Sequence, residues 1–164
     1  MRPLTIVAFV FLLAACGWHL RGSVGLPDQL KSPYLTGKNV DAGMRQLVSQ
    51  RLRDAGATEV KTISDASAVI ELTATDYRKR QVAVTADGQP STYELLYQLS
   101  YRFRLPDGSD QYQSGQVQAT LNYQYDSNQI LSKENEENRL VKQLRDEVSL
   151  RLLQQLTLKV SNAN

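Results

Sequence analysis

The residue with the most distinctive chemical setting is Cys16, the only cysteine of the 164-residue chain. It directly follows an apolar stretch from Leu4 to Ala15, and a single charge, Arg2, precedes that stretch. A short positive start, an apolar core and small residues before a cleavage point are typical of a secretory signal peptide, and a transmembrane helix needs about 20 apolar residues. Residues 1–15 are therefore predicted to be a signal peptide that is removed just before Cys16.

The four residues Leu13-Ala14-Ala15-Cys16 match the bacterial lipobox at every position. This match implies that the Cys16 thiol receives a diacylglycerol and that the new amine receives a palmitoyl group. Three acyl chains, at about 0.8 kcal/mol per buried methylene, make a lasting membrane anchor. The alternative is an ordinary buried thiol, but the only cysteine coincides with the cleavage point. Gly17, in place of Asp, implies sorting to the inner leaflet of an outer membrane.

The chain that follows residue 15 is close to electrically neutral, with 18 basic and 17 acidic side chains. Binding to nucleic acid requires a strongly basic face, so this function is disfavoured. The length suits one domain with its own core, which must be stabilised by packing because one cysteine cannot form an internal disulfide. The only histidine, His19, has no Cys or second His with which to build a metal site.

Catalytic patterns are missing from the sequence. It contains no phosphate-binding glycine loop, no zinc-ligand spacing and no Gly-x-Ser-x-Gly elbow. One histidine and one acylated cysteine exclude most pairs of nucleophile and base. A hydrolase that uses two carboxylates remains an open alternative. We predict a protein that is not an enzyme and needs no cofactor.

Residues 16–33 contain the lipidated N-terminus and many Gly, Ser and Pro residues, which predicts a linker. Residues 34–36 have the composition of a short strand. Residues 58–63 alternate like a second short strand, so together with the helix between them they predict a β-α-β opening.

The intervening helix is predicted over residues 40–55, with Asn39 or Asp41 as its N-terminal cap. Its apolar side chains recur every three or four positions, as expected of one buried face. This face consists of Met44, Leu47, Val48, Leu52 and Ala55.

The clearest periodicity lies in residues 93–105, where seven alternate side chains are apolar or aromatic: Tyr93, Leu95, Tyr97, Leu99, Tyr101, Phe103 and Leu105. A strict period of two predicts a long strand with one buried face, so the three tyrosines are more simply core residues than a ligand platform. Residues 69–85 and 111–125 predict two further strands. Turn residues at 86–90 and 106–109 join all three into an antiparallel meander.

A last helix is predicted over residues 133–156, capped by Ser132, with a frayed tail at 159–164. The fold class is α+β, with two helices packed on one face of a mixed, mostly antiparallel sheet. The sheet has four or five strands, the element order is β-α-β-β-β-(β)-α, and residues 34–158 form a single domain. The face without helices is polar and must meet water or a partner.

Three short motifs resemble one protein family. The run from Cys16 to Arg21 is similar to the mature start of the lipopolysaccharide-assembly lipoprotein family, LptE, also called RlpB. Residues 87–94 are similar to the family's Asn-Gly-Gln-x-x-x-Tyr motif. Residues 133–136, followed by Val141-Lys142, are similar to its Lys-Asp-Asn-Glu and Val-Lys motifs. The resemblance extends over residues 13–156, and the motifs and elements come in the family's order.

The resemblance implies an outer-membrane lipoprotein that plugs and helps to assemble the large lipopolysaccharide-insertion β-barrel, of the LptD type. It also implies binding of lipopolysaccharide during delivery to the outer leaflet. The protein is then lipid-anchored on the periplasmic side, inside the barrel lumen, with Trp18 close to the membrane or the barrel. The alternative is a periplasmic lipoprotein that binds lipid or envelope polymer without a barrel.

The candidate lipopolysaccharide-binding residue carried by a family motif is Lys133. A cation in the first turn of a helix is unfavourable by about 0.3–1 kcal/mol, and a lipopolysaccharide phosphate relieves this while it binds the free amides. The alternative is a solvated lysine paired with Glu136 or Glu137. Some relatives have an arginine just before the Asn-Gly turn, where this chain has Ala86, which leaves that basic position vacant or moved elsewhere.

The second candidate is the only run of three basic residues, Arg78, Lys79 and Arg80. It is expected to contact phosphorylated lipid A or an acidic barrel wall, or else to be a solvated strand end. Arg102 and Arg104 are expected on the open sheet face, where they extend the same basic patch or protect a strand edge.

Overall fold

The computed structural model describes residues 26–37, 39–106, 111–124 and 133–162. Cys16, Trp18 and the lipobox lie outside these residues. The described chain runs in the order η1 (Asp28–Leu30), β1 (Pro33–Gly37), α2 (Ala42–Asp54), η2 (Ile63–Asp65), β2 (Ala68–Val84), β3 (Pro90–Arg104), β4 (Gln113–Gln124) and α3 (Lys133–Asn162).

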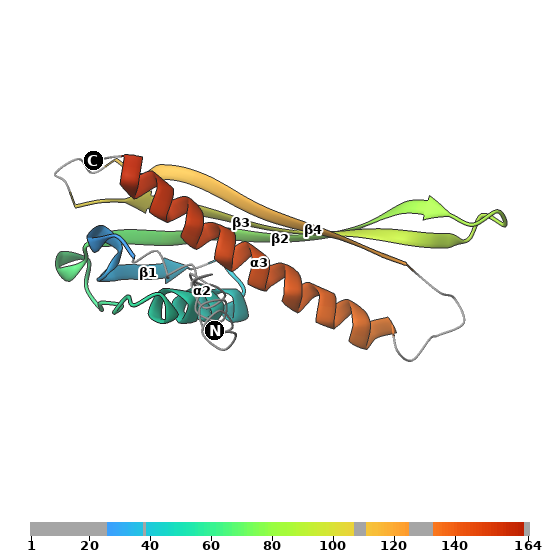
Figure 1. Cartoon of the computed structure of the whole chain (residues 1–164), viewed down its shortest axis with the longest axis horizontal. Coiled ribbons are helices and arrows are strands. Elements are labelled where there is room, and N and C mark those ends of the chain that lie inside the picture. Colours follow the sequence, from blue (N-terminus) through green and yellow to red (C-terminus); the bar gives the residue numbers. More distant parts are fainter. Residues whose placement is uncertain (1–25, 38, 107–110, 125–132, 163–164) are drawn as a thin grey trace, which may run out of the picture.

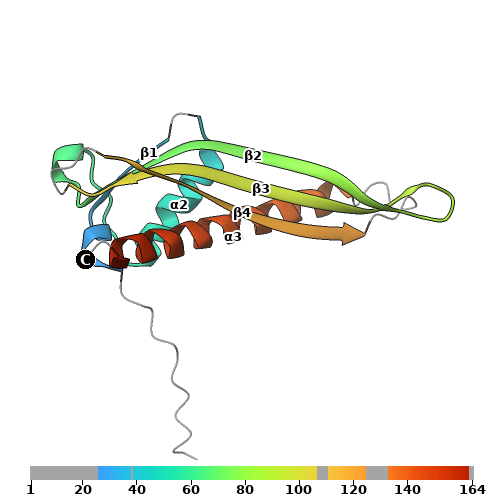
Figure 2. The same cartoon turned by 90° about the horizontal axis from the view of Figure 1, so that it is seen from above.

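The four strands form one sheet in the order β1-β2-β3-β4. Strand β1 pairs parallel with the start of β2, and the other two pairs are antiparallel. Both helices lie on the same face of this long, twisted sheet (Figures 1 and 2). The α+β fold predicted from the sequence is therefore confirmed, with four strands.

The core lies between the helices and the sheet. Asp41 caps α2 by accepting a hydrogen bond from the Gly43 amide through Oδ1 at 2.8 Å. Alternate residues of β3 face this core, as their period predicted. The largest buried side chains include Met44 and Leu52 of α2, Leu95, Leu99, Tyr101 and Phe103 of β3, and Leu144, Leu152 and Leu156 of α3.

Helix α3 is longer than its predicted end at residue 156. It continues to Asn162, and Val160 is fully buried. The expectation of a frayed tail from residue 159 is wrong for residues 159–162, because Val160 follows Leu156 by four positions and extends the same apolar stripe.

The segment from 58 to 63 is not a strand, contrary to the prediction. The amides of Thr58 and Val60 do bond to the carbonyls of Lys31 and Pro33, at 2.7 and 3.0 Å, but the chain then turns into η2. Two backbone bonds hold an extended segment beside β1 without making a ladder. The parallel partner of β1 is β2 instead.

Residues 26–33 also differ from the expected linker. Leu26 and Leu30 belong to the core, and Leu30 is fully buried. The turn-forming residues around them build the short helix η1, which directs Leu30 inward. The packed region therefore begins before β1.

A register shift between Leu72 and Ala74 changes which side chains of β2 face the helices. Before it, Leu72 pairs with Tyr101 and is buried. After it, Lys79 pairs with Leu95, so the odd-numbered residues of β2 now share a face with the buried residues of β3. An extra residue in one strand reverses its alternation, which explains why Ala74, two positions after the buried Leu72, is exposed.

Candidate functional site at the hairpin and the start of helix α3

Glu137 of α3 joins two strands of the sheet. Its Oε2 lies 2.6 Å from Lys79 Nζ of β2, and the Tyr77 hydroxyl donates to its Oε1 at 2.8 Å. The Tyr123 hydroxyl of β4 donates to Oε2 at 3.5 Å. We call these four side chains the Glu137 cluster. It ties the early turns of α3 to the sheet.

Two aromatic rings complete the surroundings of Lys79. The rings of Tyr93 and Tyr123 are stacked, with centroids 5.8 Å apart. Lys79 Nζ lies 4.7 Å from the centroid of Tyr93 and 5.7 Å from that of Tyr123. A cation at these distances is attracted by the negative faces of both rings. Lys79 is therefore held by a carboxylate and by two π-systems.

The charges of the cluster stabilise each other. Burial alone raises the pKa of Glu137, but hydrogen bonds from Lys79 and Tyr77 outweigh it and hold that pKa below its ordinary value. Burial alone lowers the pKa of Lys79, but hydrogen bonds with Glu137 and Tyr123 bring it above its ordinary value. Burial and the nearby carboxylate both raise the pKa of Tyr77. At neutral pH Glu137 and Lys79 therefore form an ion pair beside the neutral phenol of Tyr77.

The structure does not bring Arg78 and Arg80 together with Lys79. Arg78 Nε lies 2.6 Å from Asp76 Oδ2, and Arg80 Nη2 lies 2.8 Å from Glu94 Oε1. Because successive side chains of a strand point to opposite faces, these two arginines lie on the open face of the sheet and Lys79 on the helix face. The basic run is thus divided between two surfaces.

Lys133 is the first residue of α3, four positions before Glu137, so the two residues share a side of the helix. The side chain of Lys133 and the expected cap Ser132 lie outside the described residues. The two proposed acidic partners of Lys133 are engaged elsewhere, since Glu136 binds Arg139 at 2.6 and 2.9 Å and Glu137 binds Lys79. The fold brings the start of α3 and Lys79 to the same part of the molecule.

The tip of the β2–β3 hairpin projects beyond the helices (Figure 1). Its turn is closed by the Thr85 amide, which donates to the Gln89 carbonyl at 2.8 Å, and Gly88 has a positive φ of 75°. Ala86 is exposed in this turn. The apolar residues Val82 and Val84 are also exposed there, because neither helix reaches this far.

Arg102 and Arg104 do not extend the basic patch of β2. Arg102 pairs with Glu71 at 2.7 Å, and both arginines lie over the ring of Tyr112, at 5.1 and 5.4 Å. In the ladder, Arg102 is eight residues from Glu94, the partner of Arg80, which is about 26 Å along a strand. Their expected position on the open face is correct, but they form a separate cluster.

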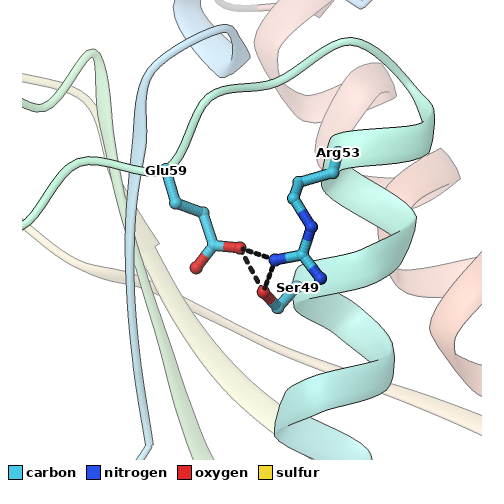
Figure 3. A network of polar contacts seen from close by, with 3 residues as sticks. All are labelled: Ser49, Arg53 and Glu59. Carbon is cyan, nitrogen blue, oxygen red and sulfur yellow. Dashed lines mark hydrogen bonds and ion pairs between the residues drawn. The ribbon is translucent and has the colours of Figure 1, made fainter.

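Sequence reasoning missed a network at the other end of the molecule (Figure 3). Arg53 Nη1 lies 3.2 Å from Glu59 Oε1, and the Ser49 hydroxyl bonds to both residues. The network borders a groove of about 610 Å³ between α2 and the extended segment after it. Ser49 and Arg53 share a helix face at a spacing of four, but only the fold reveals Glu59. The contacts brace the segment against α2.

Two observations bear on membrane and metal chemistry. Within residues 26–37, 39–106, 111–124 and 133–162, no helix is both long and apolar enough to cross a membrane. The same part of the chain contains no group of three His, Cys, Asp or Glu side chains arranged to hold a metal ion.

The sequence model of the LptE family, described as lipopolysaccharide-assembly, matches residues 29–156. This chain belongs to the LptE family. The match spans α2, all four strands and α3 as far as Leu156, including the Glu137 cluster, so the resemblance read from the short motifs is confirmed. LptE proteins are lipoproteins of lipopolysaccharide assembly in the Gram-negative envelope.

Two relatives bear the same name. The LPS-assembly lipoprotein LptE of Photorhabdus laumondii subsp. laumondii is 28% identical over 155 residues, which are 94% of this chain and 83% of that protein. The LPS-assembly lipoprotein LptE of Pectobacterium atrosepticum is 24% identical over 153 residues, which are 90% of this chain and 79% of that protein.

Solved structures support the LptE fold. The rare lipoprotein B of Shewanella oneidensis has a TM-score of 0.73 and 23% identity, with 80% of this chain and 98% of that one aligned. An uncharacterized lipoprotein B of Nitrosomonas europaea has a TM-score of 0.72 and 21% identity, with 88% of this chain and 93% of that one aligned. The arrangement of two helices on one face of a four-stranded sheet is therefore shared with lipoproteins of distant sequence.

Proposed function

We propose that this protein is an outer-membrane lipoprotein, anchored through Cys16, that occupies the lumen of the lipopolysaccharide-insertion barrel. In this position it helps the barrel, of the LptD type, to assemble and binds lipopolysaccharide on its way to the outer leaflet. It acts without catalysis. The observation that carries the proposal is the LptE family match over residues 29–156.

The shape of the domain suits a plug. Strand β3 has 15 residues and α3 has 30, which correspond to lengths of about 50 Å and about 45 Å. The hydrocarbon core of a bilayer is about 30 Å thick, so the domain is long enough to extend through a barrel. One sheet face is covered by helices, and the other presents polar side chains such as Gln98, Gln116 and Thr120 for contact with a wall.

Lipopolysaccharide binding is assigned to the start of α3. The free amides and the positive end of the helix dipole attract a phosphate, and Lys133 adds a full charge at the same position. Lys79 acts differently, because Glu137 neutralises it. It positions the first turns of α3 against the sheet, while Arg78 and Arg80 offer exposed guanidinium groups on the open face, toward the barrel wall or lipid A.

A pull-down tests the proposal. The full chain, with an affinity tag after Asn164, is extracted in mild detergent, and we expect one large outer-membrane β-barrel protein to co-purify. A Cys16→Ser variant, which cannot be lipidated, is the control for membrane attachment. Recovery of the lipidated chain alone, combined with tight binding of lipopolysaccharide, would instead favour a lipoprotein that works without a barrel.

A further inference from the structure

The two edges of the sheet are protected very differently. Strand β1 covers β2 only from Ala68 to Leu72, and the rest of that edge has register shifts at both ends and the charged run from Asp76 to Arg80. Charges and bulges are the usual means by which proteins prevent another strand from joining an edge. The β2 edge therefore disfavours the addition of a further strand.

Strand β4 lacks these protections. In the part of the chain that the structure describes, β4 pairs with β3 on one side and with no strand on the other. Its twelve residues contain no charged side chain and no proline, and its register with β3 is continuous from Gln113 to Gln124. This edge is about 40 Å of regular, uncharged backbone. It has the properties that favour addition of a strand.

A single contact shows which backbone groups point outward. Arg151 Nη1 of α3 donates to the carbonyl of Gln118 at 2.7 Å, and Glu147 holds the guanidinium at 2.7 Å through Nε. Alternate residues of a strand direct their N–H and C=O to the same side. The backbone groups of Gln116, Thr120 and Asn122 therefore also face the free edge, while Arg151 caps only the middle of it.

A groove runs beside this edge on the helix side. It has a volume of about 380 Å³ between β4 and α3. Its apolar surface comes from Ala119, Leu121 and Leu144, and its polar rim includes Gln143, Glu147 and Arg151. A strand added to β4 would direct every second side chain into this groove and the others over the polar open face.

We propose that the β4 edge is a docking site for an extended, uncharged segment of a second protein, which joins the sheet as a fifth strand. The outward amides and carbonyls supply the affinity, as in other cases of strand addition. The groove selects apolar side chains at alternate positions, and the open face selects small polar ones. The inference does not depend on whether that second protein is a barrel.

A second copy of the same chain fits this edge less well. In a symmetric pair of β4 strands, Gln118 lies near the centre, because β4 extends from Gln113 to Gln124. Both copies would then have to release the contact between Arg151 and Gln118. A foreign strand requires the release of one such contact, and afterwards its own amide can bond to the Gln118 carbonyl.

The probe is a fluorescein-labelled nine-residue peptide that alternates threonine with valine and leucine, added to the full chain in detergent. We expect saturable binding, and we expect amide exchange at Gln116, Thr120 and Asn122 to be fast in the free protein and slow in the complex. A copy of the peptide that is N-methylated at every residue keeps the side chains but loses the donors, and it should not bind.

Three variants localise the contact. Thr120→Pro removes one outward amide at a position where an edge strand tolerates proline, and it should weaken binding about tenfold. Thr120→Ala removes the same side chain but keeps the amide, so it should lose much less affinity than Thr120→Pro. Arg151→Ala uncaps the Gln118 carbonyl and should bind the peptide more tightly than the parent.

Several results would overturn the proposal. One is equal binding of the peptide and its N-methylated copy, and another is equal binding by Thr120→Ala and Thr120→Pro when circular dichroism shows both variants folded. Slow amide exchange along the edge in the free monomer would mean that another part of the chain already covers it. A dimer that Thr120→Pro abolishes would assign the edge to self-association instead.

Discussion

Lys79 and Glu137 are 58 residues apart in the chain, yet Lys79 Nζ lies 2.6 Å from Glu137 Oε2. The pair joins the second half of β2 to the early turns of α3. Among the described side chains, the buried stripe of α3 begins only at Leu140, so Glu137 joins the sheet ahead of the core contacts of the helix. The geometry of the proposed lipopolysaccharide site therefore depends on this pair.

Glu137→Gln should destabilise the domain by about 1 kcal/mol, because both side chains are about two-thirds buried and the amide keeps the shape but loses the charge. Urea unfolding of the parent, Glu137→Gln, Lys79→Met and the double variant measures the coupling. The exposed pair of Glu136 and Arg139 supplies the control, since Glu136→Gln should leave stability nearly unchanged. Additive effects of Lys79→Met and Glu137→Gln would contradict a direct coupling.

The same pair predicts how stability varies with pH. Glu137 has a folded pKa below its ordinary 4.5, so its contribution is complete above that value and is lost as the pH falls through the folded pKa. Lys79 has a folded pKa above its ordinary 10.5, so its contribution is complete below 10.5 and is lost only at still higher pH. The cluster is therefore at full strength from about pH 5 to pH 10.

Urea midpoints at pH 7 and pH 3 check this dependence. The parent should lose more stability than Glu137→Gln between these two values, because the glutamine cannot titrate. If the parent and Glu137→Gln lose the same amount of stability between pH 7 and pH 3, other carboxylates cause the acid sensitivity.

Gly115 should not tolerate a side chain. A Cβ at this position would lie 2.4 Å from Cζ of Tyr101, the residue opposite it in β3. Tyr101 is 1% exposed, so its ring is enclosed by the core and has little room to withdraw. Gly115→Ala should cost about 1–3 kcal/mol in thermal or urea unfolding.

A double-variant cycle separates the steric clash with Tyr101 from any other reason why this position in β4 would require glycine. In a Tyr101→Leu background, the additional cost of Gly115→Ala should largely disappear, because alanine has better strand propensity than glycine once the ring is gone. An equal cost in both backgrounds would rule out the contact with Tyr101 as the cause.

The sequence predicted the parts of the fold that have strong periodicity. Seven alternate apolar residues identify β3 and its buried face, and the spacing of Met44, Val48 and Leu52 identifies α2. The end of α3 was predicted too early because Val160 is flanked by Lys159 and Ser161 near the polar end of the sequence, although it continues the stripe of Leu156. Residues 58–63 alternate like a strand, but they bond to the chain around β1 only through the amides of Thr58 and Val60 and then turn into η2.

The candidate site was predicted less completely, for a physical reason. The register shift after Leu72 reverses the faces of β2, but residues 73–81 are mostly polar, so no apolar alternation reveals the change of phase in the sequence. The sequence therefore grouped Arg78, Lys79 and Arg80, which the fold separates. It identified Lys79 as basic but could not identify Glu137 as its partner, because that pairing depends on how α3 crosses the sheet.

Lys133→Asp should weaken lipopolysaccharide binding more than Arg78→Asp does. Lys133 begins α3, where the helix dipole and free amides already favour a phosphate, so reversal of its charge should cost about tenfold in affinity or more. Arg78 is already paired with Asp76 on an exposed surface, so its reversal should cost only about threefold.

Titration of the full chain with fluorescent lipopolysaccharide in detergent measures both effects. Lys159→Asp is the matched control, because it makes the same charge change in the last turn of the same helix. Its affinity should stay close to that of the parent, since a phosphate at the start of α3 lies about 39 Å away along the helix axis, well beyond the screening length of about 8 Å at physiological salt. Equal losses in Lys133→Asp and Lys159→Asp would indicate attraction by overall charge and reject a phosphate site at Lys133.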